Sequence, residues 1–224
     1  MISKLVATAR SLGKRGLLRT CKLMWAYCED YCFDLRYGID TTRRQDIESL
    51  NVIGINRGRA QGYQPTHIRA FIGLMDTLRL PAGLGFVDFG CGKGRVLLLA
   101  SRFNFRVIRG VEFSPNLCRQ ARANIEKFQD LASLHKDISV LEGDVASYVV
   151  KADEHVFFLF NPFDAVIISK VLENIIKSLQ FANRVVYFIY NNPVHDEVLR
   201  EYGLFRTRKE YLIRESRFTV YSNT

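Results

Sequence analysis

Three glycines and a carboxylate stand close together in the stretch Asp88-Phe-Gly-Cys-Gly-Lys-Gly-Arg95. The glycines are Gly90, Gly92 and Gly94, and Asp88 lies two residues before the first of them. Glycine lets the backbone approach a ligand closely, and the free N–H groups of a following helix attract an anionic group. A dinucleotide-binding turn has the spacing G-x-G-x-x-G and requires no acid at this place. The stretch therefore predicts a ligand cradle, with a nicotinamide cofactor disfavoured by the glycine spacing.

Two further acidic residues follow later apolar runs. Glu112 lies twenty-two residues after Gly90, where a carboxylate suits the two hydroxyls of a ribose, and Phe113 beside it could pack on a planar ring. Asp144 follows the next run and has two compatible interpretations, a ligand contact and an ordinary helix N-cap.

A polar residue also follows the fully apolar run 155–160, in the sequence Asn161-Pro162-Phe163. Such a run is typical of a central parallel strand covered by helices on both faces. Asn161 and its neighbours would then lie at the same edge of the sheet as the glycine turn. Asn-Pro is also a common turn, so a catalytic role and a structural role both stay open here.

The elements that position these residues alternate between strands and helices, and the chain closes in a hairpin. We expect an open α/β sheet with its ligand at the carboxyl ends of the strands. The predicted strands are Gly85–Phe89, Val107–Phe113, Ser139–Glu142, 155–160, Arg184–Tyr190, Phe205–Ile213 and Arg217–Ser222. The predicted helices are His67–Leu80 with Thr66 as its cap, one starting near Gly94, Ser114–Phe128, Asp164–Leu179 and Val194–Tyr202.

Five short motifs together resemble a bacterial group of class I methyltransferases that depend on S-adenosyl-L-methionine (SAM). They are Tyr-Gly-Ile-Asp-Thr, Tyr-Gln-Pro-Thr, Asp-Phe-Gly-Cys-Gly-Lys-Gly-Arg, Val-Glu-Phe-Ser-Pro and Phe-Asn-Pro-Phe. The resemblance covers about residues 61–224. It implies a Rossmann-like, seven-stranded mixed sheet in the order 3-2-1-4-5-7-6 with strand 7 antiparallel, following an N-terminal helical extension.

The resemblance also implies SAM as cofactor and assigns roles to the residues named above. Asp88 would hold the amino group of SAM, Asp144 the adenine amine, and Val145 would donate its N–H to the ring. Tyr63 would close over the methionine end. The cofactor-binding residues implied in this way are Tyr63, Thr66, Asp88, Gly90, Cys91, Gly92, Gly94, Glu112, Phe113, Asp144, Val145 and Asn161. Cys91 is expected to be a small filler and not a nucleophile, because methyl transfer from SAM needs no covalent enzyme intermediate.

For the reaction itself, Asn161, Pro162 and Phe163 resemble the Asn/Asp-Pro-Pro-aromatic tetrad of amino-methyltransferases. This chain departs from that tetrad, since Phe163 replaces the second proline and Asp164 stands where the aromatic residue would be. The resemblance implies in-line transfer of a methyl group to a nitrogen atom, and it identifies the cofactor much better than the substrate. The basic residues Arg43, Arg44, Arg57 and Arg59 favour a nucleic acid, a protein is about equally favoured, and a small molecule is a further alternative. The alternative from another class is a non-catalytic SAM-fold module that binds RNA or an anionic membrane surface.

The N-terminal part carries most of the excess positive charge. The chain has a net charge of +9, and residues 1–69 hold twelve Lys/Arg against six Asp/Glu, which accounts for +6. We divide the chain into a basic helical extension with a lid-like segment, 1–60, and a methyltransferase domain, 61–224.

One apolar stripe predicts a helix in the extension and consists of Leu18, Cys21, Trp25, Cys28, Cys32 and Leu35. We expect this helix to pack across the main domain; an arm for a membrane surface or anionic partner, and an organelle transit segment, are alternatives.

Composition limits the remaining possibilities. The 224 residues are 48% hydrophobic, which is ordinary for a globular chain, and no apolar run is long enough to span a bilayer. The five cysteines lack paired C-x-x-C spacing and the four histidines are scattered, so no metal site and no disulfide framework are expected. Reduced thiols favour a cytoplasmic protein.

Overall fold

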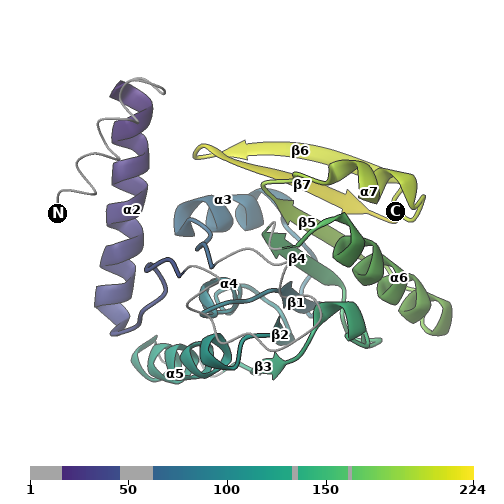
Figure 1. Ribbon diagram of the computed structural model, residues 1–224, viewed down its shortest axis with the longest axis horizontal. Helices are drawn as coiled ribbons and strands as arrows, with labels where there is room; N and C mark the ends of the chain where they lie inside the picture. Colours follow the sequence, from purple (N-terminus) through teal and green to yellow (C-terminus); the bar gives the residue numbers. More distant parts are fainter. Residues whose placement is uncertain (1–16, 46–62, 133–135, 161–162) are drawn as a thin grey trace.

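A computed structural model describes residues 17–45, 63–132, 136–160 and 163–224 of the chain. Seven strands form one sheet in the order β3-β2-β1-β4-β5-β7-β6 (Figure 1). The first five strands pair in parallel, and β7 runs antiparallel between β5 and β6. The strands are β1 Gly85–Phe89, β2 Val107–Glu112, β3 Ile138–Glu142, β4 Val156–Phe160, β5 Tyr187–Asn191, β6 Thr207–Ile213 and β7 Ser216–Ser222. This topology confirms the predicted Rossmann-like fold.

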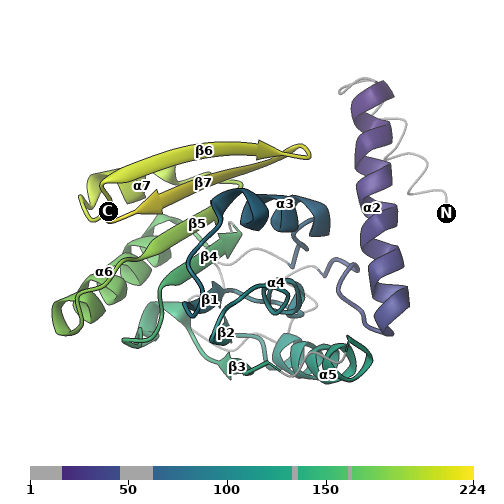
Figure 2. The same cartoon turned by 180° about the vertical axis from the view of Figure 1, so that it is seen from behind.

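Helices cover both faces of the sheet, as Figures 1 and 2 show. Side chains alternate along each strand, so neighbours on β1 belong to different cores. Phe86 packs with residues of α3, α4 and α5, and Val87 packs with residues of α6 and α7. The helices are α2 Leu17–Tyr37, α3 Ile68–Leu78, α4 Arg95–Ala100, α5 Pro115–Ala132, α6 Ala165–Phe181 and α7 Asp196–Glu201, with a 3-10 turn, η3, at Val145–Ser147. Among the described helices, none is long and apolar enough to cross a membrane.

Two predicted helix starts are confirmed by their capping bonds. Pro115 is the first residue of α5, and the Ser114 hydroxyl accepts a hydrogen bond from the Leu117 N–H at 3.4 Å. The Asp164 carboxylate accepts the Val166 and Ile167 N–H groups at 3.1 Å each and caps α6. Asp164 therefore starts a helix directly after Phe163.

The predicted cap of α3 is wrong. The capping position is His67, not Thr66, and the His67 side chain makes no capping bond. Asp30 of α2 replaces it: one carboxylate oxygen accepts the Ile68 N–H at 3.1 Å, and the other lies 3.0 Å from His67 Nδ1. A negative charge at a helix N-terminus is favoured by the helix dipole, so a residue far away in sequence has taken over the capping position.

The helix predicted at Leu18–Leu35 exists as α2, but its packed side was predicted incorrectly. Trp25 and Leu35 of the apolar stripe are 65% and 64% exposed, and Cys21, Cys28 and Cys32 are exposed as well. The buried side carries Asp30 and Asp34 instead. At its C-terminal end α2 does pack on the domain, where the ring centroids of Tyr37 and of Phe128 on α5 lie 4.6 Å apart.

Candidate functional site

The glycine turn lies where β1 ends, and the end of β2 holds it in place. Gly90 and Cys91 donate their N–H groups to the Val111 carbonyl at 2.8 and 3.2 Å. Gly90 and Gly92 have φ values of +77° and +54°, a region that L side chains rarely adopt. The turn thus needs glycine at these positions for its own geometry.

A pocket opens beside this turn at the carboxyl ends of the parallel strands, where open α/β sheets place their ligands. Eight of the predicted cofactor-binding residues line it: Tyr63, Thr66, Asp88, Gly90, Cys91, Gly92, Glu112 and Phe113. The other lining residues are Gln64, Pro65, Arg95, Val96, Leu117, Phe158, Phe160, Phe163 and Asn192. Acid, aromatic and backbone groups from five separate stretches of the sequence therefore meet around one space.

Two buried carboxylates face the pocket. Asp88 and Glu112 are each 3% exposed. Glu112 accepts the Gly92 N–H at 3.0 Å and the Ser114 N–H at 2.9 Å. Burial raises the pKa of Glu112 to about 7, although these N–H groups oppose the rise. Burial, and then the charge of Glu112, hold the pKa of Asp88 well above its usual range. A cationic ligand in the pocket would stabilise the ionised form of both.

The raised pKa of Glu112 predicts a pH-dependent stability of the ligand-free protein. The folded state keeps a proton that the unfolded chain has lost, so this stabilisation is present below about pH 4.5 and disappears as pH rises through about 7. We expect the free energy of unfolding, measured in urea without ligand, to fall by up to about 3 kcal/mol over this window. Glu112→Gln should flatten the curve, with Asp88 retaining part of the slope. The same slope in both proteins would contradict the assignment.

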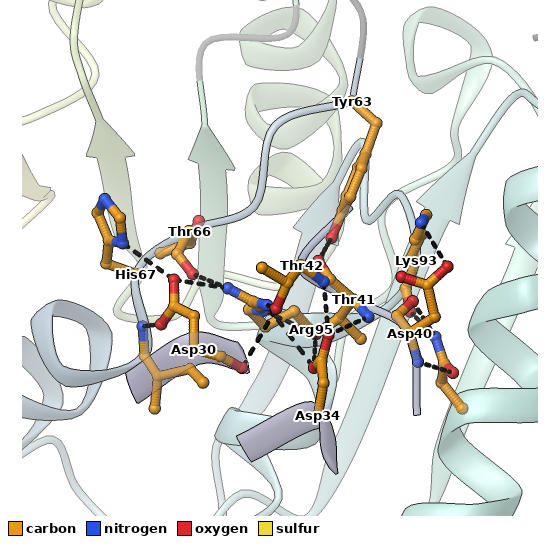
Figure 3. Close-up of polar contacts among 12 residues, drawn as sticks. Asp30, Asp34, Asp40, Thr41, Thr42, Tyr63, Thr66, His67, Lys93 and Arg95 are labelled. Atoms are coloured by element: carbon orange, nitrogen blue, oxygen red, sulfur yellow. Dashed lines mark hydrogen bonds and ion pairs between the residues drawn. The ribbon is translucent and has the colours of Figure 1, made fainter. Parts of the chain in front are cut away.

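Tyr63 lies directly over the glycine turn. A Cβ atom added to Gly92 would come within 2.3 Å of the Tyr63 ring. The Tyr63 hydroxyl donates to the Thr41 carbonyl at 2.7 Å, and Lys93 Nζ lies 5.5 Å from the ring centroid (Figure 3). Burial raises the pKa of Tyr63, so the phenol stays protonated. The Tyr63 ring thus covers the glycine turn, and its closure over the methionine end of SAM stays a prediction.

Arg95, which follows the turn and lines the pocket, binds residues from several separate segments of the chain (Figure 3). Its guanidinium is 2% exposed, lies 2.9 Å from Asp30 and 3.7 Å from Asp34, and donates to the Thr66 carbonyl at 3.2 Å. It also donates to the hydroxyls of Thr41 at 2.8 Å and Thr42 at 2.5 Å. Arg95 thereby connects α2, the segment after α2, and the segment before α3 to the first turn of α4.

Lys93 makes a second connection of the same kind. Its side chain is completely buried, and Nζ lies 2.9 Å from the Asp40 carboxylate (Figure 3). Asn124 of α5 holds this region too, accepting the Asp40 N–H at 3.1 Å and donating to the Lys93 carbonyl at 3.0 Å. The cations nearest the pocket are thus engaged with Asp30, Asp34 and Asp40, and the charges of Asp88 and Glu112 stay available to a ligand.

Sequence reasoning did not assign roles to Arg95, Lys93, Asp30 or Asp34. A signal was present, because α4 reads Arg-Val-Leu-Leu-Leu-Ala and all six of its residues are buried. An arginine in such a helix requires buried partners. Asp30 and Asp34 are four residues apart and share one side of α2, where they meet that requirement.

Three predicted cofactor residues do not line the pocket. Gly94 begins α4 and allows it to approach α5, since a Cβ there would lie 3.2 Å from that of Ala121. Asp144 accepts the Ala146 N–H at 2.9 Å and caps η3, which is the structural role that the sequence also allowed. Val145 is buried in the core beneath α6. Asn161 and Pro162 lie outside the described residues, whereas Phe163 is buried and lines the pocket.

Residues 87–187 match a protein-family model described as a methyltransferase domain. The match includes the glycine turn, Glu112 and Asn161. No curated protein sequence matches the chain.

Solved structures share the fold at low sequence identity. Precorrin-8W decarboxylase from Methanobacterium thermoautotrophicum is 16% identical, with a TM-score of 0.53 over 71% of this chain and 92% of that chain. A SAM-dependent methyltransferase from Aquifex aeolicus is 16% identical, with a TM-score of 0.52 over 69% and 89%. An RNA methyltransferase from Salinibacter ruber, solved with S-adenosyl-L-homocysteine, is 16% identical, with a TM-score of 0.51 over 70% and 91%.

Proposed function

We propose, from the premise that this chain is a class I, SAM-dependent methyltransferase, that it methylates a nitrogen atom of a protein or nucleic acid. The observation that carries the proposal is the pocket in which two buried carboxylates meet a glycine turn. Residues 61–224 are the SAM-binding domain in this proposal. Residues 1–60 are its extension, and the segment around Tyr63 covers the pocket.

The residues around the pocket fit the methionine and ribose parts of SAM. Asp88 holds the amino group, directly or through water, and the backbone of Gly90 and Gly92 leaves room for the methionine portion. Glu112 has lone pairs beyond those used by Gly92 and Ser114, and these accept the ribose hydroxyls. The two carboxylates are buried, so a ligand with a positive charge compensates the cost of ionising them.

Aromatic and backbone groups complete the adenine end. Phe113 lines the pocket next to Glu112 and packs on the ring. The resemblance assigns Asp144 and Val145, which follow β3, to the edge of the adenine ring, and we keep that assignment in the proposal.

Little covalent chemistry is required of the protein. SAM supplies an electrophilic methyl group on a sulfonium, which is already activated for in-line displacement. Asn161 and the Pro162 carbonyl orient the acceptor nitrogen by hydrogen bonds, and Phe163 supplies an apolar wall that excludes water. Arg43 and Arg44, both exposed on the segment that follows α2, are available to a phosphate or an acidic side chain.

Cofactor and acceptor are tested in two steps. A thermal-shift experiment compares SAM with NAD, because a ligand that binds only the folded state raises its apparent stability. A shift with SAM and none with NAD is expected. Labelled SAM is then offered with enzyme to cell lysate pretreated with nuclease or protease, and the treatment that removes the labelled product identifies the acceptor class. Labelling that survives both treatments would contradict a macromolecular acceptor.

Asn161→Ala tests the proposed orientation of the acceptor. Loss of one hydrogen bond that forms at the reacting group should lower kcat by about 100-fold. Binding of SAM, followed by calorimetry, should change little, since Asn161 acts on the acceptor. Unchanged turnover would remove Asn161 from the mechanism, and equal losses of SAM affinity and turnover would place it in the cofactor site.

A further inference from the structure

Helix α2 directs its apolar side to solvent and its acidic side into the protein. Seven of its side chains form one exposed row, which we call the apolar ridge: Cys21, Met24, Trp25, Cys28, Tyr31, Cys32 and Leu35. Each of them has another member of the row three or four residues away, so they share one side of the helix. The row contains no Lys, Arg, His, Asp or Glu. Asp30 and Asp34 lie on the opposite side and are buried.

The orientation of α2 is fixed by its buried acids. Asp30 lies 2.9 Å from the Arg95 guanidinium, and Asp34 accepts the Thr41 and Thr42 N–H groups at 2.7 and 2.6 Å (Figure 3). Rolling the helix to bury Trp25 would separate these charges from their partners inside the protein. The apolar ridge is therefore held facing outward, and Figures 1 and 2 show α2 at one side of the molecule. A row of large apolar side chains kept at the surface marks an interaction site.

The charges around the apolar ridge favour an anionic partner. The first 28 residues contain six Lys/Arg and no Asp/Glu. The next acid, Glu29, is paired with Arg69 at 3.4 Å, and the two acids after it are the buried Asp30 and Asp34. A helix with an apolar side, aromatic residues at that side and flanking cations has the composition of one that lies in a membrane interface.

We propose that α2 docks the protein on an anionic lipid bilayer, with the apolar ridge in the headgroup region and the N-terminal cations attracted to the lipid charge. A second copy of the chain fits less well. In a parallel pair Lys22 of one copy would lie beside Lys22 of the other. In an antiparallel pair Lys22 would approach Arg36 of the other copy, so like charges meet in both arrangements.

Trp25 reports on this surface directly, because it is the single tryptophan of the chain and lies in the apolar ridge. The full-length protein is mixed with vesicles of phosphatidylcholine alone or with added phosphatidylglycerol. We expect a blue shift of the Trp25 emission and quenching by brominated lipid with the anionic vesicles only. The response should weaken as salt is added, because salt screens the attraction.

Vesicle co-sedimentation compares the full-length protein with Leu35→Gln and with the double variant Trp25→Gln/Leu35→Gln. The double variant should bind anionic vesicles about tenfold or more weakly, since it removes two of the large apolar contacts. Phe181→Gln is the control: Phe181 is 93% exposed at the end of α6, and its loss should leave vesicle binding unchanged. The variants' circular dichroism and SAM-induced thermal shift should match the wild type, which keeps this test separate from the proposed function.

Three results would overturn the proposal. One is the absence of binding to anionic vesicles, and another is equal binding to neutral vesicles. The third is a dimer, seen by sedimentation equilibrium, that Trp25→Gln/Leu35→Gln dissociates while vesicle binding is unaffected. In that case the ridge is an interface between two copies of the chain.

Discussion

Gly92→Val is expected to weaken SAM binding by about 1000-fold or more, which is a loss of about 4 kcal/mol. Gly92 has φ +54°, where a β-branched residue is strained. Its new Cβ would also lie 2.3 and 2.4 Å from two atoms of the Tyr63 ring. Tyr63 cannot move away freely, because its hydroxyl is bonded to the Thr41 carbonyl at 2.7 Å. The turn must then change shape, and the Gly92 N–H is withdrawn from Glu112. Titration calorimetry with SAM and S-adenosyl-L-homocysteine measures the loss.

Three companion variants separate an effect on the pocket from a general loss of stability. Gly83→Ala also places a side chain at positive φ, but its Cβ meets nothing within 4 Å, so SAM affinity should stay at the wild-type value. Gly92→Ala should bind SAM poorly for the reason given above, and removing the ring in Gly92→Ala/Tyr63→Ala should restore part of the affinity. Retained SAM binding by a folded Gly92→Val protein would count against the cradle.

The sheet and the pocket could be predicted from sequence because their signals are local. A strand covered on both faces is apolar throughout, as in Val156–Phe160, and the turn after β1 needs glycine within a few residues. Asp88 lies near the end of β1, and Glu112 is the last residue of β2. The carboxyl ends of these two strands meet at one edge of the sheet. Once the strands are recognised, the topology of an open α/β sheet brings those acids together.

The packing of α2 could not be predicted in the same way, because its determinant lies elsewhere in the chain. The apolar stripe through Trp25 and Leu35 is typical of a packed helix face, and hydrophobic periodicity alone favours burying it. Arg95 reverses the outcome. Arg95 is buried at the start of α4, and its side chain reaches the α2 side of the protein. One residue that it binds there, Thr41, lies 54 positions earlier in the chain. A periodic pattern within one helix carries no information about such a partner.

The capping of α3 was missed for the same reason. Local rules favour Thr66 as a cap because a threonine precedes the apolar run. The structure instead uses Asp30, which is 38 positions away from the Ile68 N–H that it accepts. One acid thus satisfies both a helix start and a buried arginine, and the two demands together fix where α2 lies.

Arg95→Met is expected to lower the free energy of unfolding by about 3–5 kcal/mol, the usual cost of breaking a buried ion pair from one side. Methionine fills much of the same space, so the loss comes from charge and hydrogen bonding. Asp30 and Asp34 would remain buried without their cation, and the Thr66 carbonyl would lose its donor. Urea unfolding followed by circular dichroism measures the change. Lys170→Met removes an exposed pair with Glu173 and serves as the control, with little change in stability expected, because solvent screens an exposed ion pair.

A triple variant shows whether the stability lost in Arg95→Met arises from Asp30 and Asp34, which that variant leaves buried without a cation. Asp30→Asn/Asp34→Asn/Arg95→Met removes the two negative charges together with the positive one. It should be more stable than Arg95→Met alone, because residues that share one network are strongly non-additive. Arg95→Lys should lie between Arg95→Met and the wild type, since an ammonium keeps the charge but cannot reach Asp30, Thr41, Thr42 and the Thr66 carbonyl at once. If the triple variant were less stable than Arg95→Met, the lost bonds of Asp30 and Asp34 to the Ile68, Thr41 and Thr42 N–H groups would outweigh the relief of charge, and the two unpaired carboxylates would not be the cause of the Arg95→Met loss.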